Sequence, residues 1–209
     1  MCPNTPWYRA NALVVLCHRQ LWVCGVEHND ISVKNLMYDE LNEDRGILND
    51  YDLAHLNGRA RPSGLGRTGT MPFMAYELLT TEAWEGKIER LYRHDCESFA
   101  WVLLWVCCRY DGGKEISNPP LSELITRDYG QCFEKKHTIS SKIARIIATP
   151  LYQSFWDASV SLNVFYYQQL TREASKARQE YTPEYTPNGL KGKCLEIKGG
   201  GYRHYLNLG

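Results

Sequence analysis

The sequence lacks most of the features that assign a chain to a special class of protein. Its 209 residues carry 24 basic and 24 acidic side chains, so its formal net charge is zero, unlike the basic surface of a nucleic-acid binder. The segment MCPNTPWYRA has no apolar signal-peptide core. The longest apolar run, Phe99–Cys108, is too short to span a bilayer and is typical of a buried helix. We therefore expect an intracellular protein, cytoplasmic or nuclear, that binds neither nucleic acid nor membranes.

The eight cysteines show no metal-binding or disulfide pattern. None of them forms a C-x-x-C pair, and no histidine cluster accompanies them at zinc-ligand spacing. Several stand inside apolar runs, where a free cysteine behaves as a small hydrophobic residue. We expect reduced, buried thiols, and scattered disulfides in a secreted protein are the less favoured alternative.

The spacing of apolar residues predicts a mainly α fold with a few short strands. Apolar residues recur at three- and four-residue intervals over 7–25, which favours a helix with one apolar face that stops at Gly25. A second helix, from Asp95 to about Arg109, is apolar on nearly every side and should lie in the centre of the domain. Short strands are expected near residues 36–50, and the last packed helix over 151–170.

The extent of the apolar pattern suggests one domain followed by a tail. Residues 7–170 are long enough, and apolar enough, for a single domain with a sizeable core. Beyond them the character changes, because Tyr-Thr-Pro occurs twice and Gly199–Gly201 form a glycine run. We expect the polar segment 171–209 to be disordered.

Four short motifs carry the candidate chemistry. His28–Asn35 reads HNDISVKN and places Asp30 and Asn35 five residues apart. Next comes NDYDLA, which contains Asp50, and then the stretch RTGTMPFMAYELL, which spans residues 67–79. RHDCESFAWVLLW then opens the central helix. Phosphoryl transfer needs this kind of set, namely a carboxylate to orient the attacking hydroxyl and oxygen ligands for magnesium on the nucleotide.

In this order and at these separations, the four motifs resemble the fungal-type protein kinase family, which is similar to eukaryotic protein kinases. The resemblance is strong over about residues 7–110 and weaker to about 170. It implies the mainly helical C-terminal lobe of a two-lobed α+β parent fold, with the N-terminal lobe absent. The implied activity is ATP-dependent phosphoryl transfer to a protein hydroxyl, of Ser or Thr rather than Tyr, with ATP and Mg²⁺ as the cofactors.

The resemblance also assigns roles to the residues nearest the chemistry. Asp30 would be the catalytic base for the substrate hydroxyl. Asn35 and Asp50 would be magnesium ligands and so part of the cofactor site. Ser/Thr kinases usually have a Lys two residues after the catalytic Asp, where this chain has Ser32. Lys34 stands where tyrosine kinases have an Arg, and would neutralise charge on the transferred phosphoryl group.

Four further residues would support the site. His28 would pack beneath the catalytic loop, and Thr70 would hydrogen-bond the catalytic Asp. Glu77 would anchor the activation segment through an ion pair with an Arg that the motifs do not identify. Asp95 would accept backbone hydrogen bonds from the catalytic loop.

The chain departs from the kinase pattern in several places. Asn29 replaces the Arg of H-R-D, which indicates that phosphate on the activation loop is not read by that pairing. Asp52 replaces the Gly of D-F-G, and Tyr76 the Pro of A-P-E. No Gly-rich loop and no V-A-I-K-like strand precede His28. We therefore expect the chain alone to be inactive and a poor ATP binder.

Three alternatives accompany this interpretation. Small-molecule phosphotransferases share the H-x-D-x-x-x-x-N loop but lack a segment like Gly69–Glu77, which argues against them. The chain could instead be a truncated pseudokinase, an interaction module whose partner covers the surface left by the missing N-terminal lobe. A fragment or an incomplete gene model of a longer enzyme is the third. The protein substrate is not indicated.

Overall fold

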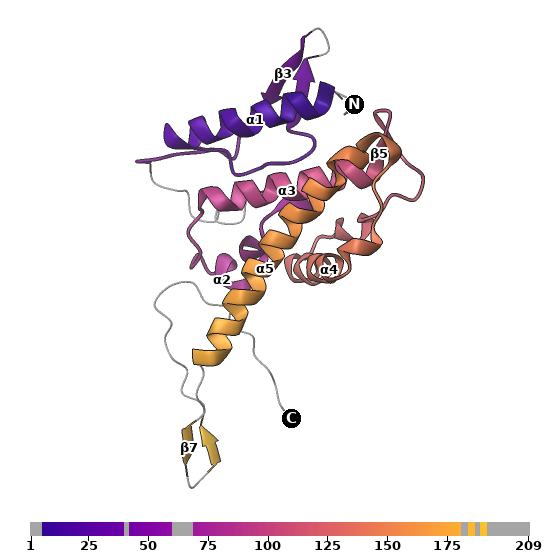
Figure 1. Ribbon diagram of the computed structural model, residues 1–209. Coiled ribbons are helices and arrows are strands. Elements are labelled where there is room, and N and C mark those ends of the chain that lie inside the picture. The colour runs from indigo at the N-terminus through magenta and orange to yellow at the C-terminus, as the bar shows by residue number, and fades with distance from the viewer. Residues whose placement is uncertain (1–5, 40–41, 60–68, 181–183, 187–188, 192–209) are drawn as a thin grey trace.

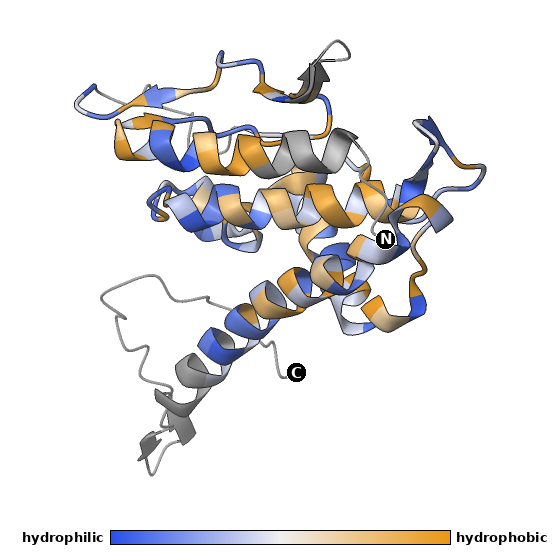
Figure 2. Cartoon of the chain, turned by 45° about the horizontal axis from the view of Figure 1, so that its top comes forward, coloured by the Kyte–Doolittle hydropathy of each residue, from blue (hydrophilic) through white to orange (hydrophobic). Residues whose placement is uncertain are grey.

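A computed structural model of the chain describes residues 6–39, 42–59, 69–180, 184–186 and 189–191. Its three long helices are α1 (Pro6–Val23), α3 (Tyr92–Arg109) and α5 (Trp156–Glu180). Figures 1 and 2 show α1 and α3 side by side, with α5 crossing the other side of α3. This arrangement confirms the expectation of a mainly α chain.

Helix α3 forms the centre of the fold. Thirteen of its eighteen residues are buried, and Trp101, Leu104 and Cys107 belong to the hydrophobic core. The core also takes in side chains from α1, α4 and α5. The apolar run in the sequence therefore predicted the central helix correctly, because a helix that is surrounded by other elements is apolar on all its faces.

Short helical segments connect the long helices. They are η2 (Met71–Phe73), η3 (Tyr76–Leu79), α2 (Thr81–Trp84), η4 (Ser122–Leu124), α4 (Tyr129–Ser141), η5 (Ile143–Arg145) and η6 (Pro150–Phe155). Within the described ranges, no helix is both long enough and apolar enough to cross a membrane.

The strands form small antiparallel pairs. The pairs are β1 (Val26–Glu27) with β4 (His55–Leu56), β2 (Leu36–Asp39) with β3 (Asn42–Leu48), β5 (Tyr110–Asp111) with β6 (Lys114–Glu115), and β7 (Glu184–Thr186) with β8 (Gly189–Lys191). In the β2–β3 pair Leu36 faces Leu48, so the chain enters this hairpin at Asn35 and leaves it at Asn49. The strands predicted near residues 36–50 are present.

Two expectations need correction. Helix α5 continues to Glu180, ten residues past the predicted end at 170. The added sequence TREASKARQE is polar but rich in strong helix formers, so low hydrophobicity did not imply disorder there. The thiols are not all buried either. Cys107, Cys108 and Cys132 are, but Cys17 and Cys24 are exposed on and just after α1. The rest of the predicted tail lies mostly outside the described residues.

Candidate active site

The loop between β1 and β2 carries the HNDISVKN motif, and it follows shortly after the end of α1. Helix α1 ends at Val23, and Gly25 follows with a φ of 82°, which is unfavourable for residues with a side chain. The chain then pairs briefly with β4 and turns through His28–Asn35 into β2. Asp30 is half-buried in this loop, and the β2–β3 hairpin brings Asn49 and Asp50 next to its end.

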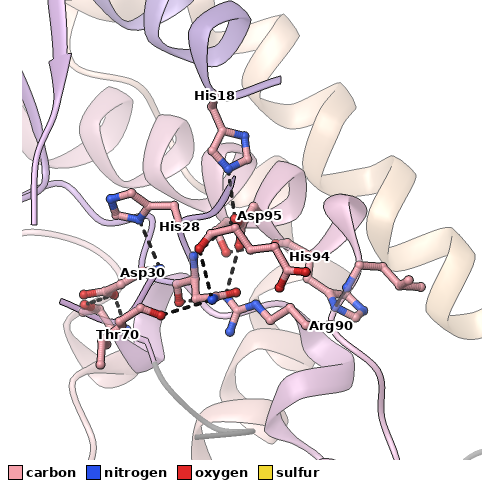
Figure 3. Close-up of polar contacts among 12 residues, drawn as sticks. His18, His28, Asp30, Thr70, Arg90, His94 and Asp95 are labelled. Atoms are coloured by element: carbon pink, nitrogen blue, oxygen red, sulfur yellow. Dashed lines mark hydrogen bonds and ion pairs between the residues drawn. The ribbon is translucent and has the colours of Figure 1, made fainter. Parts of the chain in front are cut away.

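Asp30 is held by the segment that follows forty residues later. Its Oδ1 accepts two hydrogen bonds from Thr70, one from the backbone N–H at 2.7 Å and one from the hydroxyl at 2.8 Å (Figure 3). Its Oδ2 accepts from the side-chain amide of Asn35 at the longer distance of 3.2 Å. The same amide donates to the backbone carbonyl of Asp30 at 2.8 Å. One carboxylate oxygen is thus fully engaged, and the other keeps acceptor capacity.

Gly69 makes the contact between Thr70 and Asp30 possible. Its φ is 135°, a conformation that favours glycine. A Cβ at this position would lie 3.1 Å from the carbonyl oxygen of Asn29 and 3.3 Å from the Met74 side chain. A larger residue would therefore push the segment away from the catalytic loop. The Gly-Thr pair of the motif has a steric reason as well as a hydrogen-bonding one.

Asn35 and Asp50 offer oxygen atoms of the kind that magnesium prefers. Because Asn35 uses its amide nitrogen on Asp30, its Oδ1 is left as a potential ligand. Asp50 is exposed, and within the described part of the chain its side chain accepts one hydrogen bond, from the backbone N–H of Asp52 at a long 3.4 Å. No three His, Cys, Asp or Glu side chains in the described ranges gather as a metal site. The residues therefore fit Mg²⁺ held jointly with nucleotide phosphates, since that ion needs only one or two protein oxygens.

His28 links the two halves of this arrangement. Its Nδ1 accepts from the Asp30 backbone N–H at 3.3 Å, so the ring proton lies on Nε2, which donates to the Asn49 carbonyl at 2.9 Å. Burial lowers the pKa of His28, which favours this neutral form. The edge of the ring contacts Tyr51, with the centroids 4.8 Å apart. A neutral histidine therefore connects the loop of Asp30 to the strand end that carries Asp50.

Asp95, at the start of α3, sits in a buried network beneath the loop (Figure 3). Its Oδ2 accepts from His18 Nε2 at 2.9 Å and from the backbone N–H of Asn29 at 3.4 Å. Its Oδ1 accepts from Arg90 Nη2 at 3.0 Å. Burial alone would raise the pKa of Asp95, but the His18 hydrogen bond and the Arg90 charge outweigh it and lower the pKa to about 2.

Arg90 also supports the catalytic loop directly. The same Nη2 donates to the Asn29 carbonyl at 2.8 Å. Asn29 has a φ of 69°, a left-handed conformation that asparagine tolerates better than most residues. Its side-chain amide donates to the carbonyls of Glu27 and Leu53, at 3.2 and 3.1 Å. Asn29, which replaces the Arg of H-R-D, is therefore buried and connects the loop to the segment after Asp50 by side-chain hydrogen bonds.

Glu77 has the arginine partner that the motifs left unidentified, and a histidine besides. Arg93 Nη2 donates to both carboxylate oxygens, at 2.7 and 2.5 Å, and His94 Nε2 donates to Oε2 at 2.5 Å. His94 Nδ1 accepts from the backbone N–H of Leu91, which places the ring proton on Nε2. Burial alone would raise the pKa of Glu77, but the hydrogen bonds from His94 and Arg93 lower it to about 2.

The eight residues predicted from sequence do not all meet in one place. The structure joins Asp30, Asn35 and Thr70 by hydrogen bonds, and His28 reaches the strand end beside Asp50. Glu77 and Asp95 lie in separate supporting contacts. Lys34 is exposed, and within the described part of the chain its side chain makes no recorded hydrogen bond or ion pair.

Sequence reasoning missed three supporting side chains. His18 lies on α1, 77 residues from its partner Asp95. Arg90 precedes α3 and Arg93 opens the RHDCESFAWVLLW motif, but the motifs gave neither residue a role. A buried His on an otherwise apolar helix face, and two Arg beside the HD pair, are the signals that could have drawn attention to them.

The comparison with protein families agrees with the motifs. The family described as fungal protein kinase matches residues 12–107, a range that includes all eight predicted site residues. Over this range the chain is similar to the fungal protein kinase family. No curated protein shows significant similarity to the chain.

Proposed function

We propose that this chain carries the catalytic half of a protein kinase site, which transfers the γ-phosphoryl group of ATP to a Ser or Thr hydroxyl of a protein. The fold would then be the C-terminal lobe of that kinase. The observation that supports this function best is the hydrogen-bonded set of Asp30, Thr70 and Asn35. It brings a carboxylate and a potential magnesium ligand together, as the chemistry requires, and Thr70 orients the carboxylate. The similarity to the fungal protein kinase family over residues 12–107 also supports it.

The two oxygens of Asp30 have different tasks in this mechanism. Oδ1 is occupied by the two donors of Thr70, which orient the carboxylate. Oδ2 has a single long bond to Asn35 and can accept the substrate hydroxyl. As the hydroxyl oxygen bonds to the γ-phosphorus, the bond from that phosphorus to the β-γ bridging oxygen breaks and ADP leaves. The hydroxyl proton passes to Asp30 and later to solvent.

Asn35 Oδ1 and the Asp50 carboxylate would hold magnesium on the nucleotide phosphates. When bound, ATP would supply the phosphoryl group and Mg²⁺ would neutralise part of its charge. Lys34 would add a second positive charge, because its exposed ammonium is only one residue from Asn35. This role for Lys34 rests on its position in the motif.

The nucleotide site needs more than these residues. The sequence before His28 has no Gly-rich loop and no lysine in a V-A-I-K-like strand. Each missing electrostatic contact of this type lowers transition-state stabilisation by about 3–4 kcal/mol. We therefore expect the chain alone to bind Mg-ATP weakly and to transfer phosphate very slowly.

A titration of Mg-ATP into the chain, followed by calorimetry, tests the proposal. Asp50→Gly removes the proposed ligand without strain, because glycine adopts the φ of 62° found at this position. Asp52→Gly removes the neighbouring exposed carboxylate and serves as the matched control. We expect heat of binding from the parent chain and Asp52→Gly but not from Asp50→Gly. Equal binding by both variants would refute the assigned ligand.

A second function, a non-catalytic interaction module, is favoured by one observation. Large apolar side chains are exposed on α1 and on the β2–β3 hairpin, two elements that pack against each other. Leu16 is 62% exposed, and Met37 and Ile47, which face each other across the hairpin, are 47% and 39% exposed. A partner that covers this surface would bury them. This function predicts that no variant, nor the parent chain, binds Mg-ATP.

A further inference from the structure

One face of helix α4 follows the segment that leads from Thr70 to Glu77. Three α4 residues spaced four apart contact successive positions of it, and such spacing places side chains on one helix face. Cys132 Sγ donates to the Met71 carbonyl at 3.5 Å. Lys136 Nζ donates to the Met74 carbonyl, and Ser140 Oγ lies 2.8 Å from the hydroxyl of Tyr76. The three α4 residues belong neither to the four motifs nor to the site described above.

Lys136 interacts with a second buried group of opposite charge, Glu97 of α3. Glu97 Oε1 accepts from the backbone N–H of Tyr76 at 2.9 Å and from the indole N–H of Trp101 at 3.4 Å. The ammonium of Lys136 lies 4.1 Å from the centroid of the Trp101 ring. Lys136 is fully buried and Glu97 nearly so. Burial raises the pKa of Glu97 and lowers that of Lys136, while their mutual attraction opposes both shifts.

Stability alone does not account for two buried charges. Removing a lysine and a glutamate from water costs free energy that their attraction often fails to recover. What the two side chains do achieve is local, because they bind the backbone groups of Met74 and Tyr76 on either side of Ala75. This stretch lies between two short 3-10 helices, so its polar groups need partners from elsewhere.

The pair also accounts for Tyr76, which stands where kinases have the Pro of A-P-E. Proline has no backbone N–H and could not donate to Glu97. Tyr76 supplies this donor, and its hydroxyl reaches Ser140. Its ring packs edge-on against Trp101 and Phe133. The substitution and the buried acid are thus parts of one contact.

We propose that Lys136 and Glu97 are positioning residues that fix the backbone of residues 70–76, and that α4 thereby shapes the surface that receives the protein substrate. The part about substrate rests on the proposed kinase function. The part about position does not, since it concerns only how Thr70 is kept against Asp30. The segment is continuous, because the Phe73 N–H donates to Thr70 and the Met74 N–H to Met71.

Amide hydrogen exchange in the full chain, measured residue by residue by NMR, tests the proposal. The informative amides are those of Thr70, Phe73, Met74 and Tyr76, all of which donate hydrogen bonds. In Lys136→Met we expect these amides to exchange about ten- to a hundredfold faster relative to the amides of α1 and α3. Lys142→Met, at the exposed end of α4, is the control and should leave them unchanged.

A double variant separates positioning from general stability. Lys136→Met alone leaves Glu97 as a lone buried acid and could unfold the chain. Lys136→Met with Glu97→Gln leaves no lone charge, and the exchange of α1 and α3 should recover while residues 70–76 stay fast. Uniform acceleration that persists in the double variant, or recovery of residues 70–76 in the double variant, would overturn the proposal. The readout needs no phosphoryl transfer, so it stays informative even if the chain binds no nucleotide.

Discussion

The two sides of the catalytic loop differ in how their polar groups are used. On the side of α3, Asp95 is inaccessible to solvent and accepts hydrogen bonds from His18, Arg90 and the Asn29 backbone. On the opposite side, Asp50 is exposed and accepts a single long bond from its own turn. Both residues are aspartates that the kinase motifs single out, yet among the described residues one accepts three hydrogen bonds and the other accepts one.

This difference separates residues that shape the loop from residues that face a ligand. A buried carboxylate with three donors cannot bind a cation without breaking its own network, whereas an exposed one with free lone pairs can. Substitutions on the α3 side should therefore change the free energy of unfolding, and those on the Asp50 side should change binding.

Removal of Asp95 should have the largest effect on stability. Asp95→Ala leaves the buried guanidinium of Arg90 without its carboxylate and also removes the partner of His18. Loss of one member of a buried ion pair lowers the free energy of unfolding by about 3 to 5 kcal/mol. Urea unfolding monitored by circular dichroism measures this, with the exposed Asp52→Ala as control. If Asp95→Ala lowers the free energy of unfolding no more than Asp52→Ala does, Asp95 does not stabilise the fold.

The second-largest effect is expected at low pH, which should weaken the contacts of Glu77. The pKa of Glu77 is lowered to about 2 in the folded chain, from an ordinary value of 4.5. A lowered pKa means that its contribution is fully present above pH 4.5 and is lost as the pH falls towards 2. The full change in pKa corresponds to about 3.4 kcal/mol. Solvent screening of the exposed Arg93 reduces the contribution to about 2 to 3 kcal/mol.

Unfolding in urea at several pH values between 5 and 2 tests this. Glu77→Gln should be less stable than the parent at pH 5 and should lose less stability on acidification. Glu89→Gln, at an exposed glutamate, should follow the parent. If Glu77→Gln and the parent lose stability in parallel, the ion pairs with Arg93 and His94 do not stabilise the folded chain.

The smallest effect is expected at the hydroxyl of Tyr76. Tyr76→Phe removes only the hydrogen bond to Ser140, 2.8 Å long and buried. Its loss should lower the free energy of unfolding by about 1 kcal/mol. A double-mutant cycle with Ser140→Ala isolates the interaction, because the second substitution should then cost little in the presence of the first. Fully additive losses would show that the two hydroxyls are not coupled.

The sequence predicted the parts of this structure that depend on nearby residues. The apolar run placed the central helix, and motif spacing singled out Asp30 and Asn35, which the structure joins by hydrogen bonds. Thr70 was also named, because the Gly-Thr pair is a recognisable element of the segment. The sequence pattern of TREASKARQE was misjudged, since its polarity outweighed its helix propensity in our expectation.

Partners that are distant in sequence could not be predicted in this way. Lys136 binds the Met74 carbonyl across 62 residues, and His18 binds Asp95 across 77. A lone lysine in an amphipathic helix normally faces solvent, and nothing in the pattern indicates that this one is buried. Such pairings depend on how helices pack, which periodicity alone does not define.

The most direct test of the central claim is to find where a divalent cation sits when nucleotide is added. Mn²⁺ can replace Mg²⁺, and its unpaired electrons broaden the NMR signals of nearby amides even when binding is weak. With Mn-ATP added to the ¹⁵N-labelled chain, our account predicts that the amides of Asn35 and Asp50 broaden first, and that Asp50→Gly abolishes the effect. Broadening centred elsewhere, or none in the parent chain, would contradict the account and favour an interaction module.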